Sequence, residues 1–543
     1  MRTKYFLVLA GGLIFAFAGC TDLSQPDGVN NEEFSLLSKS RDSTPKFVYS
    51  GVPKFAYGFN DNMVLQRGTE MNVWGFANPG TDVTVSLDTQ HVSAKADRYG
   101  KWLLQLAPMT AGGPYSLTLN SGPTTQTLTN VLIGDVWICS GQSNMRYALS
   151  SKDVSGNYIF QDELTAIQNQ SSFPIRHFMN LDENTKWFEV NYLNATDTSI
   201  NLRGVTAVGY FFAKHLRNVL GDVPIGIIQT GAGGRAIRHF IPKDIQWADP
   251  NMYLMNEPYW EDLIEEFGEE VLADYEQRLN AWLAGESSSQ LCPVLSSTYP
   301  GILFYEHIPP LRNMKFKGTV YYQGEGDAGR GQYYRQPLGV LVDFYREYFD
   351  FPDMPFIDVI LPPYGESVGV YYPDVADSQL AVADAKSGVG ASYAPEAGDP
   401  TNIHPPKKEI VGQRAAMAAL VEAYGGSNAY LGPRYLSDTK ANGKVTVTFK
   451  DTGGGLELAA GESVLTGFQL SGANDNFVDA TAQLTADPNT VEITIPAELQ
   501  SEPDIYVRYN WKIWYEPVLY GQNGLPAVFF RTDTFDLITT GTY

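Results

Sequence analysis

Ser143 stands in a turn that could serve a nucleophile. It ends the segment Gly141-Gln142-Ser143, which follows the apolar run 131–139. A serine nucleophile must be lifted on a tight turn, and a glycine lets the backbone approach a substrate closely. Serine and glycine are also ordinary turn residues. The turn therefore indicates nucleophilic catalysis only if a general base can be found elsewhere in the chain.

The candidate base is His404. The sequence has six histidines, and His404 is the one within a polar loop, 399–406, that follows a predicted strand. An early nucleophile and a late histidine also form one of the chain orders that assemble a catalytic triad in α/β sheets. The remaining histidines fall in predicted β structure, in a predicted helix or beside apolar residues: His91, His177, His215, His239 and His307.

A parallel sheet would bring these loops together. The middle of the chain alternates predicted strands with predicted helices, and in such sheets ligands bind at the carboxyl ends of the strands. The predicted strands are 131–139, 224–229, 319–322, 356–361 and 389–393, and the predicted helices are 205–220, 332–348, 375–385 and 407–424. The sequence therefore predicts an α/β domain over residues 131–425.

Two flanking regions have β patterning. Short alternating runs between turn residues fill 47–130 and return in 426–543, which predicts an N-terminal and a C-terminal β-sandwich domain. The second domain could bind sugar or, as we favour, pack against the active site. Trp511 and Trp514 would suit either role.

The first residues read as an export signal. Arg2 and Lys4 precede an apolar run that ends at Cys20, which is typical of a bacterial lipoprotein signal over residues 1–20. We expect Cys20 to be acylated and the polar residues 21–46 to form a flexible tether. The protein would then be exported, and it would be periplasmic or anchored in the outer membrane. The alternative is an ordinary signal peptide with a chance cysteine.

Charge and composition exclude several partners. The formal net charge is −23 at pH 7, which argues against nucleic acid because phosphate binding needs dense Lys and Arg. Beside Cys20 the chain has Cys139 and Cys292, which make no disulfide framework, and no spacing suits a metal. Because the export signal ends at Cys20, we expect contact with a membrane only through the lipid anchor.

Several motifs resemble the sialate O-acetylesterase family, a branch of the SGNH hydrolases. Further likeness lies in both flanking regions, so the resemblance covers nearly all of the chain from residue 47. The motifs are Gly134-Asp135-Val136-Trp137 with Ser140-Gly141-Gln142-Ser143-Asn144-Met145, then Gln323-Gly324-Glu325, Ile403-His404-Pro405, Asn62-Met63-Val64-Leu65-Gln66 and Gly524-Leu525-Pro526-Ala527. The resemblance implies a three-layer, flavodoxin-like parallel sheet, and it implies no metal and no other cofactor.

The resemblance also implies roles. His404 would take the proton of Ser143 as it attacks an acetyl carbonyl, and water would hydrolyse the acetyl-enzyme. Donors for the oxyanion would come from the backbone of Ser143, from Gly233 or Gly234, and from the Gln323 side chain. We expect Glu325 to brace its own loop.

Two positions depart from the family pattern. Asn402 occupies the place where relatives carry an aspartate two residues before the histidine, so we favour Asp399 as the carboxylate that orients His404. Arg235 replaces a usual threonine after the paired glycines. Its guanidinium could bind the carboxylate of a sialic acid with two hydrogen bonds, although it could instead pair with an internal acid.

These patterns predict a carbohydrate O-acetylesterase that removes acetyl groups from sialic acids. One alternative is an acetylesterase for other acetylated polysaccharides, such as acetyl xylan, because the same catalytic groups and fold would serve it. The other is a glycan-binding lipoprotein without activity.

Overall fold

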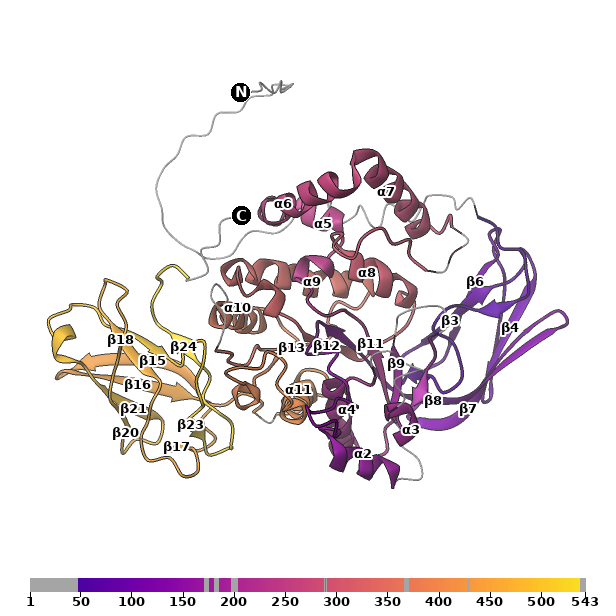
Figure 1. Cartoon of the computed structure of the whole chain (residues 1–543). Coiled ribbons are helices and arrows are strands. Elements are labelled where there is room, and N and C mark those ends of the chain that lie inside the picture. The colour runs from indigo at the N-terminus through magenta and orange to yellow at the C-terminus, as the bar shows by residue number, and fades with distance from the viewer. Residues whose placement is uncertain are drawn as a thin grey trace, which may run out of the picture. The chain divides into compact units, whose positions relative to one another are not determined.

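The computed structural model describes residues 47–169, 175–179, 185–196, 204–287, 289, 291–365, 371–427 and 429–537, which Figure 1 draws in colour. Cys20, the expected signal and the expected tether lie outside the described residues. Within those ranges no helix is both long enough and apolar enough to cross a membrane.

The middle of the chain is built on a mixed sheet with the order β10-β9-β11-β8-β12-β13-β14. All pairs are parallel except that of β10 with β9. The predicted strands of the middle region are all present. The bounds are β8 (Thr124–Gly141), β9 (Ile175–Met179), β10 (Phe188–Glu189), β11 (Ile225–Gln229), β12 (Gly318–Tyr322), β13 (Phe356–Val359) and β14 (Val389–Ser392).

The strand order places Ser143 where the topology reverses. With β9 and β10 left out, the order β11-β8-β12-β13-β14 is the 2-1-3-4-5 order of flavodoxin-like sheets. The chain proceeds from β8 first to one neighbour, β11, and later to the other, β12. Ligands bind at such a switch point, beyond the carboxyl ends of the strands. Ser143 follows the end of β8 at this place.

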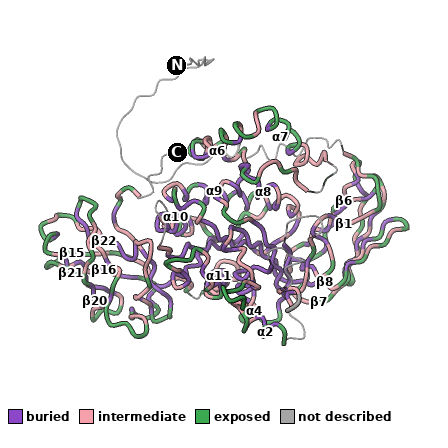
Figure 2. The backbone as a smooth tube through the Cα atoms, viewed as in Figure 1, coloured by how far each residue is buried: buried purple, intermediate pink, exposed green. Residues whose placement is uncertain are grey.

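Helices cover the sheet. In Figure 1, α4 and α11 lie below the strands and α9 and α10 above them, and the sheet itself is buried in Figure 2. The residues of β9, β11, β12, β13 and β14 are buried throughout, as expected of strands covered on both faces. The predicted helices are confirmed as α4 (Ala207–Leu220), α9 (Arg335–Tyr348), α10 (Tyr372–Ala385) and α11 (Lys408–Glu422).

A helical insertion between β11 and β12 was not predicted. It forms the upper part of Figure 1. Aromatic side chains hold it together, since Trp260 packs against Trp247 and Tyr299 with ring centroids 5.8 and 6.0 Å apart. Its helices are α5 (Lys243–Ala248), α6 (Pro250–Phe267), α7 (Glu269–Leu283) and α8 (Ile302–His307), and two further helices lie between β8 and α4, namely α2 (Gln161–Gln168) and α3 (Tyr192–Thr196).

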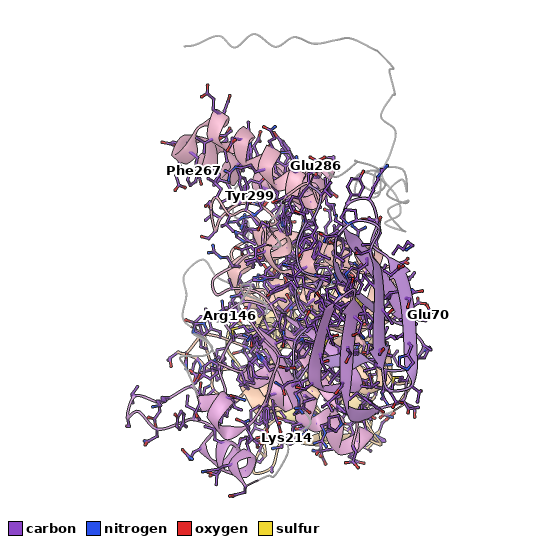
Figure 3. The ribbon with its side chains drawn as sticks, turned by 90° about the vertical axis from the view of Figure 1, so that its right-hand side faces the viewer. Glu70, Arg146, Lys214, Phe267, Glu286 and Tyr299 are labelled. Atoms are coloured by element: carbon purple, nitrogen blue, oxygen red, sulfur yellow. The ribbon has the colours of Figure 1, made fainter. Side chains whose placement is uncertain are left out.

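The N-terminal β region runs into the central sheet without a break. The first part of β8 pairs with β7 and alternates in burial, whereas from residue 131 onward every residue of β8 is buried. The domain boundary predicted at 130/131 therefore falls inside one strand. The other strands, whose broad faces are turned toward the viewer in Figure 3, are β1 (Lys54–Phe55), β2 (Val64–Gln66), β3 (Met71–Phe76), β4 (Asp82–Leu87), β5 (Gln90–Lys95), β6 (Lys101–Leu106) and β7 (Gly112–Ser121).

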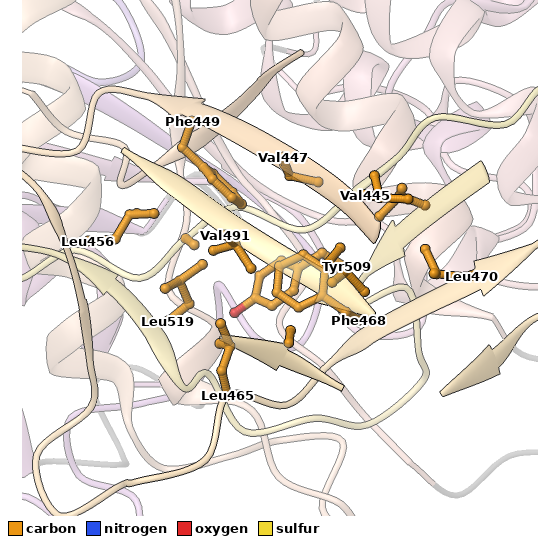
Figure 4. Close-up of a cluster of buried hydrophobic side chains, with 14 of the residues drawn as sticks. Val445, Val447, Phe449, Leu456, Leu465, Phe468, Leu470, Val491, Tyr509 and Leu519 are labelled. Carbon is orange, nitrogen blue, oxygen red and sulfur yellow. The ribbon is translucent and has the colours of Figure 1, made fainter. Parts of the chain in front are cut away.

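The C-terminal region has its own apolar core. Figure 4 shows Val447, Phe449, Val491 and Leu519 gathered between its strands. Its sheets are β15 (Arg434–Ala441), β16 (Lys444–Lys450), β21 (Thr490–Thr494) and β20 (Ala482–Leu484); β19 (Val478–Asp479), β18 (Phe468–Ser471), β22 (Tyr506–Tyr509) and β24 (Phe530–Arg531); and β17 (Leu456–Leu458) with β23 (Leu519–Gly521).

This region packs on the loops at the end of the central sheet. The backbone N–H of Tyr364 donates to the Ile513 carbonyl at 2.8 Å, and the Tyr371 hydroxyl donates to the Trp511 carbonyl at 3.2 Å. Trp511 is 3% exposed and belongs to a core cluster that includes Ile360. Trp511 therefore packs the two regions together and is not open to a sugar.

Candidate active site

Ser143 and His404 meet at the carboxyl end of the central sheet. Ser143 follows β8, and His404 lies in the loop between β14 and α11, 261 residues further along the chain. The Oγ atom of Ser143 is 2.7 Å from Nε2 of His404. This distance is within the range needed for proton transfer to a general base.

Glycines allow the loops around Ser143 to touch. Gly141 has φ 148°, and a Cβ atom there would lie 2.1 Å from the carbonyl oxygen of Tyr322. Gly231 has φ 100°, and its Cβ would lie 1.9 Å from the carbonyl oxygen of Gly141. Any larger residue would push the loops after β8, β11 and β12 apart.

The paired glycines lie beside the nucleophile. A Cβ atom on Gly233 would be 3.6 Å from Cβ of Ser143, and both Gly233 and Gly234 are exposed. Arg146, labelled in Figure 3, holds this loop because its Nη1 donates to the carbonyl oxygen of Gly231 at 3.3 Å. The loop therefore presents backbone next to Ser143.

Gln323 is buried beneath the site. Its side chain is 0% exposed, and its Nε2 lies within hydrogen-bond distance of Asp327 Oδ2 (2.7 Å), the Arg235 carbonyl (3.0 Å) and Gln142 Oε1 (3.1 Å). An amide has two N–H donors, so these acceptors occupy both. In this structure Gln323 ties three loops together and offers no donor to an oxyanion.

Asp399 is turned toward the backbone of its own loop. Its Oδ1 accepts the N–H groups of Thr401 at 2.9 Å and Asn402 at 2.8 Å. Among the described contacts, no hydrogen bond joins this carboxylate to His404. Asn402 caps the same loop, because its Oδ1 accepts the backbone N–H of His404 at 2.9 Å.

The electrostatics around His404 favour the neutral imidazole. Burial, followed by the nearby charge of Lys408, lowers the pKa of His404 below its usual 6.5. Hydrogen bonds from the backbone, chiefly from Thr401, lower the pKa of Asp399. These shifts favour an uncharged His404 imidazole and an ionised Asp399 carboxylate.

Arg235 follows the glycine loop and is partly exposed. Its Nε has no hydrogen-bond partner, and no ion pair within the described ranges joins it to an Asp or Glu. Arg238 differs, because its guanidinium lies 3.6 Å from the ring centre of Tyr259. The predicted internal partner of Arg235 is therefore missing from the described part of the chain.

Asn144 and Lys408 are site residues that the sequence prediction missed. Asn144 was quoted only as part of a motif. It connects Ser143 to Lys408, which donates to its Oδ1 at 2.6 Å. One signal was available for Lys408: a lysine at the start of a predicted helix opposes the helix dipole and calls for an explanation.

The other histidines are held elsewhere. His177 is buried in β9 against Gln229, and His215 lies in α4. His91 lies on β5, with its Nδ1 2.8 Å from the Ser86 hydroxyl on β4. His239 and His307 are also buried. In the described ranges no cluster of three or more His, Cys, Asp or Glu residues could hold a metal ion.

Comparisons with known proteins point the same way. A family model described as carbohydrate esterase, sialic acid-specific acetylesterase, matches residues 133–291. Sialate O-acetylesterase of Mus musculus is 26% identical over 521 residues, which cover 85% of this chain and 90% of the mouse protein. The Homo sapiens enzyme is 28% identical over 321 residues, about half of each protein (54% and 53%).

A solved structure is similar to this chain over nearly its whole length. A carbohydrate acetylesterase from Xanthomonas citri is 28% identical, covers 89% of this chain and 100% of its own, and superposes with a TM-score of 0.72. The fold is thus mixed α/β, with a large mixed sheet and additional β sheets. Together these matches confirm the resemblance to the sialate O-acetylesterase family, and the chain is an esterase.

Proposed function

We propose that the protein removes acetyl groups from a carbohydrate through an acetyl-enzyme on Ser143. The observation that supports this most is the 2.7 Å contact between Ser143 Oγ and His404 Nε2. Oγ attacks the acetyl carbonyl while its proton passes to Nε2. The ester bond to the sugar breaks, and the sugar oxygen takes that proton from Nε2 and leaves as a hydroxyl. Water, deprotonated by His404, then attacks the acetyl group, which departs as acetate and frees Ser143.

The oxyanion is stabilised by backbone N–H groups in this proposal. The candidates are Ser143 itself and Gly233 or Gly234, since the glycine loop lies against Ser143. Such donors typically contribute about 10²–10³ in rate. We leave Gln323 out, because its amide already has three acceptors.

Asp399 has a modified role in the proposal. The sequence favoured it as the acid partner of His404, completing a Ser-His-Asp triad. Because its Oδ1 is used by the N–H groups of Thr401 and Asn402, we propose that it supports His404 by holding the loop.

For the substrate we propose an O-acetylated sialic acid. The family match and the mammalian relatives carry that specificity in their names. Arg235 supports it, since this arginine follows the glycine loop and has no acidic partner in the described part of the chain. A guanidinium can bind the sialate carboxylate with two parallel hydrogen bonds.

A second candidate is acetylesterase activity on other acetylated polysaccharides. It is favoured by the relative from Xanthomonas citri, which is named only as a carbohydrate acetylesterase and is similar over nearly the whole chain. The glycan-binding alternative without activity has less support, since the Ser143–His404 pair keeps the geometry of a working nucleophile and base.

A substrate panel would test these proposals. Acetate release should be measured on an aryl acetate, on O-acetylated sialic acids and on acetylated xylan, with Ser143→Ala as the control. Release from the sialic acids at the highest kcat/KM supports the first candidate, and a preference for acetyl xylan supports the second. No Ser143-dependent release from any of them would overturn both.

We infer the finer fold and the cellular location on separate grounds. The strand order supports a three-layer SGNH hydrolase domain between two β-sandwich domains. The sequence around Cys20 supports export and lipid anchoring. Cys20→Ser should then lose lipid labelling and leave the membrane fraction while its specific activity stays the same. Unchanged fractionation would speak against the anchor.

A further inference from the structure

Lys408 is a buried cation at the start of a helix. Its side chain is 0% exposed, α11 begins at this residue, and its Nζ donates to Oδ1 of Asn144 at 2.6 Å. A helix N-terminus carries partial positive charge, so a lysine there is unfavourable, and burying the ammonium group adds a desolvation cost. Its neighbours must therefore offset both effects.

Asn144 connects Lys408 to the two catalytic loops. It directly follows Ser143, and its Nδ2 donates at 2.9 Å to the carbonyl oxygen of Ile403, which directly precedes His404. A single amide thus ties the nucleophile loop to the histidine loop. An amide has its acceptor and its donors on opposite sides. The bond from Lys408 to Oδ1 therefore fixes the orientation in which Nδ2 faces Ile403.

Glu325 supplies the charge that opposes Lys408. Its Oε1 accepts from Asn144 Nδ2 at 2.5 Å. Burial raises the pKa of Glu325, and the Lys408 charge acts against that rise. Burial lowers the pKa of Lys408 to about 7, and Glu325 opposes that fall. The rings of Tyr147 and Tyr322 lie 5.1 and 5.6 Å from Nζ, which also favours the ammonium form.

Lys408 further acts on His404 through its charge. It is the nearby cation that, after burial, lowers the pKa of His404. A general base must be neutral before it can take a proton. In the pH range where His404 loses its own proton, below the usual 6.5, Lys408 with a pKa of about 7 is still mostly protonated. Lys408 is therefore charged in the pH range in which His404 becomes neutral.

We propose that Lys408 is a positioning residue for ester hydrolysis, which fixes the Asn144 amide between the Ser143 and His404 loops. Lys408 touches no substrate and acts through Asn144 and through its charge. The inference rests on the proposed function, because it concerns the pair of residues that would carry it out.

Other charged groups around α11 are engaged with one another or with Glu325. From α4, Lys214 and His215 face Glu409, each at 3.9 Å. The remaining groups are Glu396 with Arg414 (3.2 Å), Asp135 with Tyr424 (2.9 Å), Asp358 with Gln379 (3.2 Å), and Asp327 and Tyr372 near Glu325. Among the described residues, Lys408 is the cation whose charge lowers the pKa of His404.

The test compares two neighbouring lysines. Lys407 is exposed and donates to the Glu396 carbonyl, so Lys407→Met is a matched control for Lys408→Met. Lys408→Met, Lys407→Met, Lys408→Arg and the unchanged protein should be assayed with an aryl acetate from about pH 4.5 to 9, with thermal unfolding recorded for each. We expect Lys408→Met to lose about 10²-fold in kcat, the effect of a small misplacement of catalytic groups, with little change in KM.

The pH profile separates positioning from damage. Without the Lys408 charge the pKa of His404 rises, so the acid limb of kcat/KM should move to higher pH. Lys408→Arg, which keeps the charge, should restore the position of the limb, and Lys407→Met should match the unchanged protein. A folded Lys408→Met protein with unchanged kcat, or with an unmoved acid limb, would overturn the inference.

A second variant covers the case in which Lys408→Met does not fold. Asn144→Asp has the same size and still accepts from Lys408 but cannot donate to Ile403, so it should lose kcat to a similar extent. Unchanged kcat in Asn144→Asp would also overturn the inference. Absence of Ser143-dependent hydrolysis in the unchanged protein would instead overturn the proposed function together with it.

Discussion

The polar groups around Ser143 and His404 fall into a buried set and an exposed set. Lys408, Gln323 and Asn144 are at most 2% exposed, and both Lys408 and Gln323 donate hydrogen bonds to the loop that contains Asn144. Arg235 is partly exposed and follows the exposed glycines Gly233 and Gly234 in its loop. Buried hydrogen bonds are strong and costly to break, so we assign geometry to the first set and substrate contact to the second. The first should govern kcat, and the second KM.

The largest effect should come from the residue that both sets serve. Ser143→Ala removes the nucleophile, so kcat on an aryl acetate should fall by at least about 10³-fold, with the thermal unfolding midpoint unchanged because Ser143 is only partly buried. A serine-directed phosphonate should label the unchanged protein at Ser143 alone. If the purified variant keeps more than a few per cent of the rate, the division into two sets has no catalytic meaning.

Asp399 tests whether a partly exposed carboxylate can belong to the geometric set. Asp399→Asn keeps an oxygen that can accept from Thr401 and Asn402, so we expect kcat to fall by less than about tenfold, whereas Asp399→Ala removes the acceptor and should cost more. Steady-state kinetics of both variants decide this. A fall of about 10⁴-fold for Asp399→Asn would show that the carboxylate reaches His404 during the reaction and acts as its acid partner.

The meeting of Ser143 with His404 and the strands of the sheet could be predicted from the sequence because both depend on local patterns. Ser143 follows an apolar strand, and His404 stands in a polar loop at the end of another. The continuous strand β8 was harder to predict, since its change from alternating to full burial at residue 131 looks like a domain boundary. The pattern shows which residues are buried, but it does not show that the chain continues as one strand.

The buried set could not be predicted in detail. Lys408 and Asn144 are 264 positions apart in the sequence, so their contact arises only from the packing of α11 against the loop after β8. The same holds for Gln323, whose predicted donor role assumed a free amide. Its acceptors include the Arg235 carbonyl, 88 positions away, and Asp327 in the turn that follows it, and neither contact leaves a periodic signal.

The pH profile should reflect the buried set. Burial and Lys408 lower the pKa of His404, and the base must be neutral, so activity should rise with pH through a midpoint below 6.5. The dependence of kcat/KM on pH reports this midpoint for the free enzyme. His215→Gln in α4 is the control, since another histidine should leave the limb in place. A midpoint above 6.5 would contradict the electrostatic role given to the buried set.

The smallest effect should come from Arg235, and it should appear in KM. Arg235 is partly exposed, so losing a hydrogen bond to the substrate carboxylate should raise KM for an O-acetylated sialic acid by about tenfold, near the lower end expected for a charged bond. KM for a neutral acetylated sugar should stay the same in Arg235→Ala. Arg235→Lys keeps a charge but cannot bind with two parallel bonds, so its KM for the O-acetylated sialic acid should lie between the values for the unchanged protein and for Arg235→Ala.

The net charge of the protein should matter less than this one arginine. At about 0.15 M salt the Debye length is near 8 Å, so the net charge of −23 is largely screened once the sugar is bound, and a nearby cation determines how well the carboxylate binds. Equal changes for both sugars would show that Arg235 does not read the carboxylate, and a fall in kcat alone would move it into the geometric set.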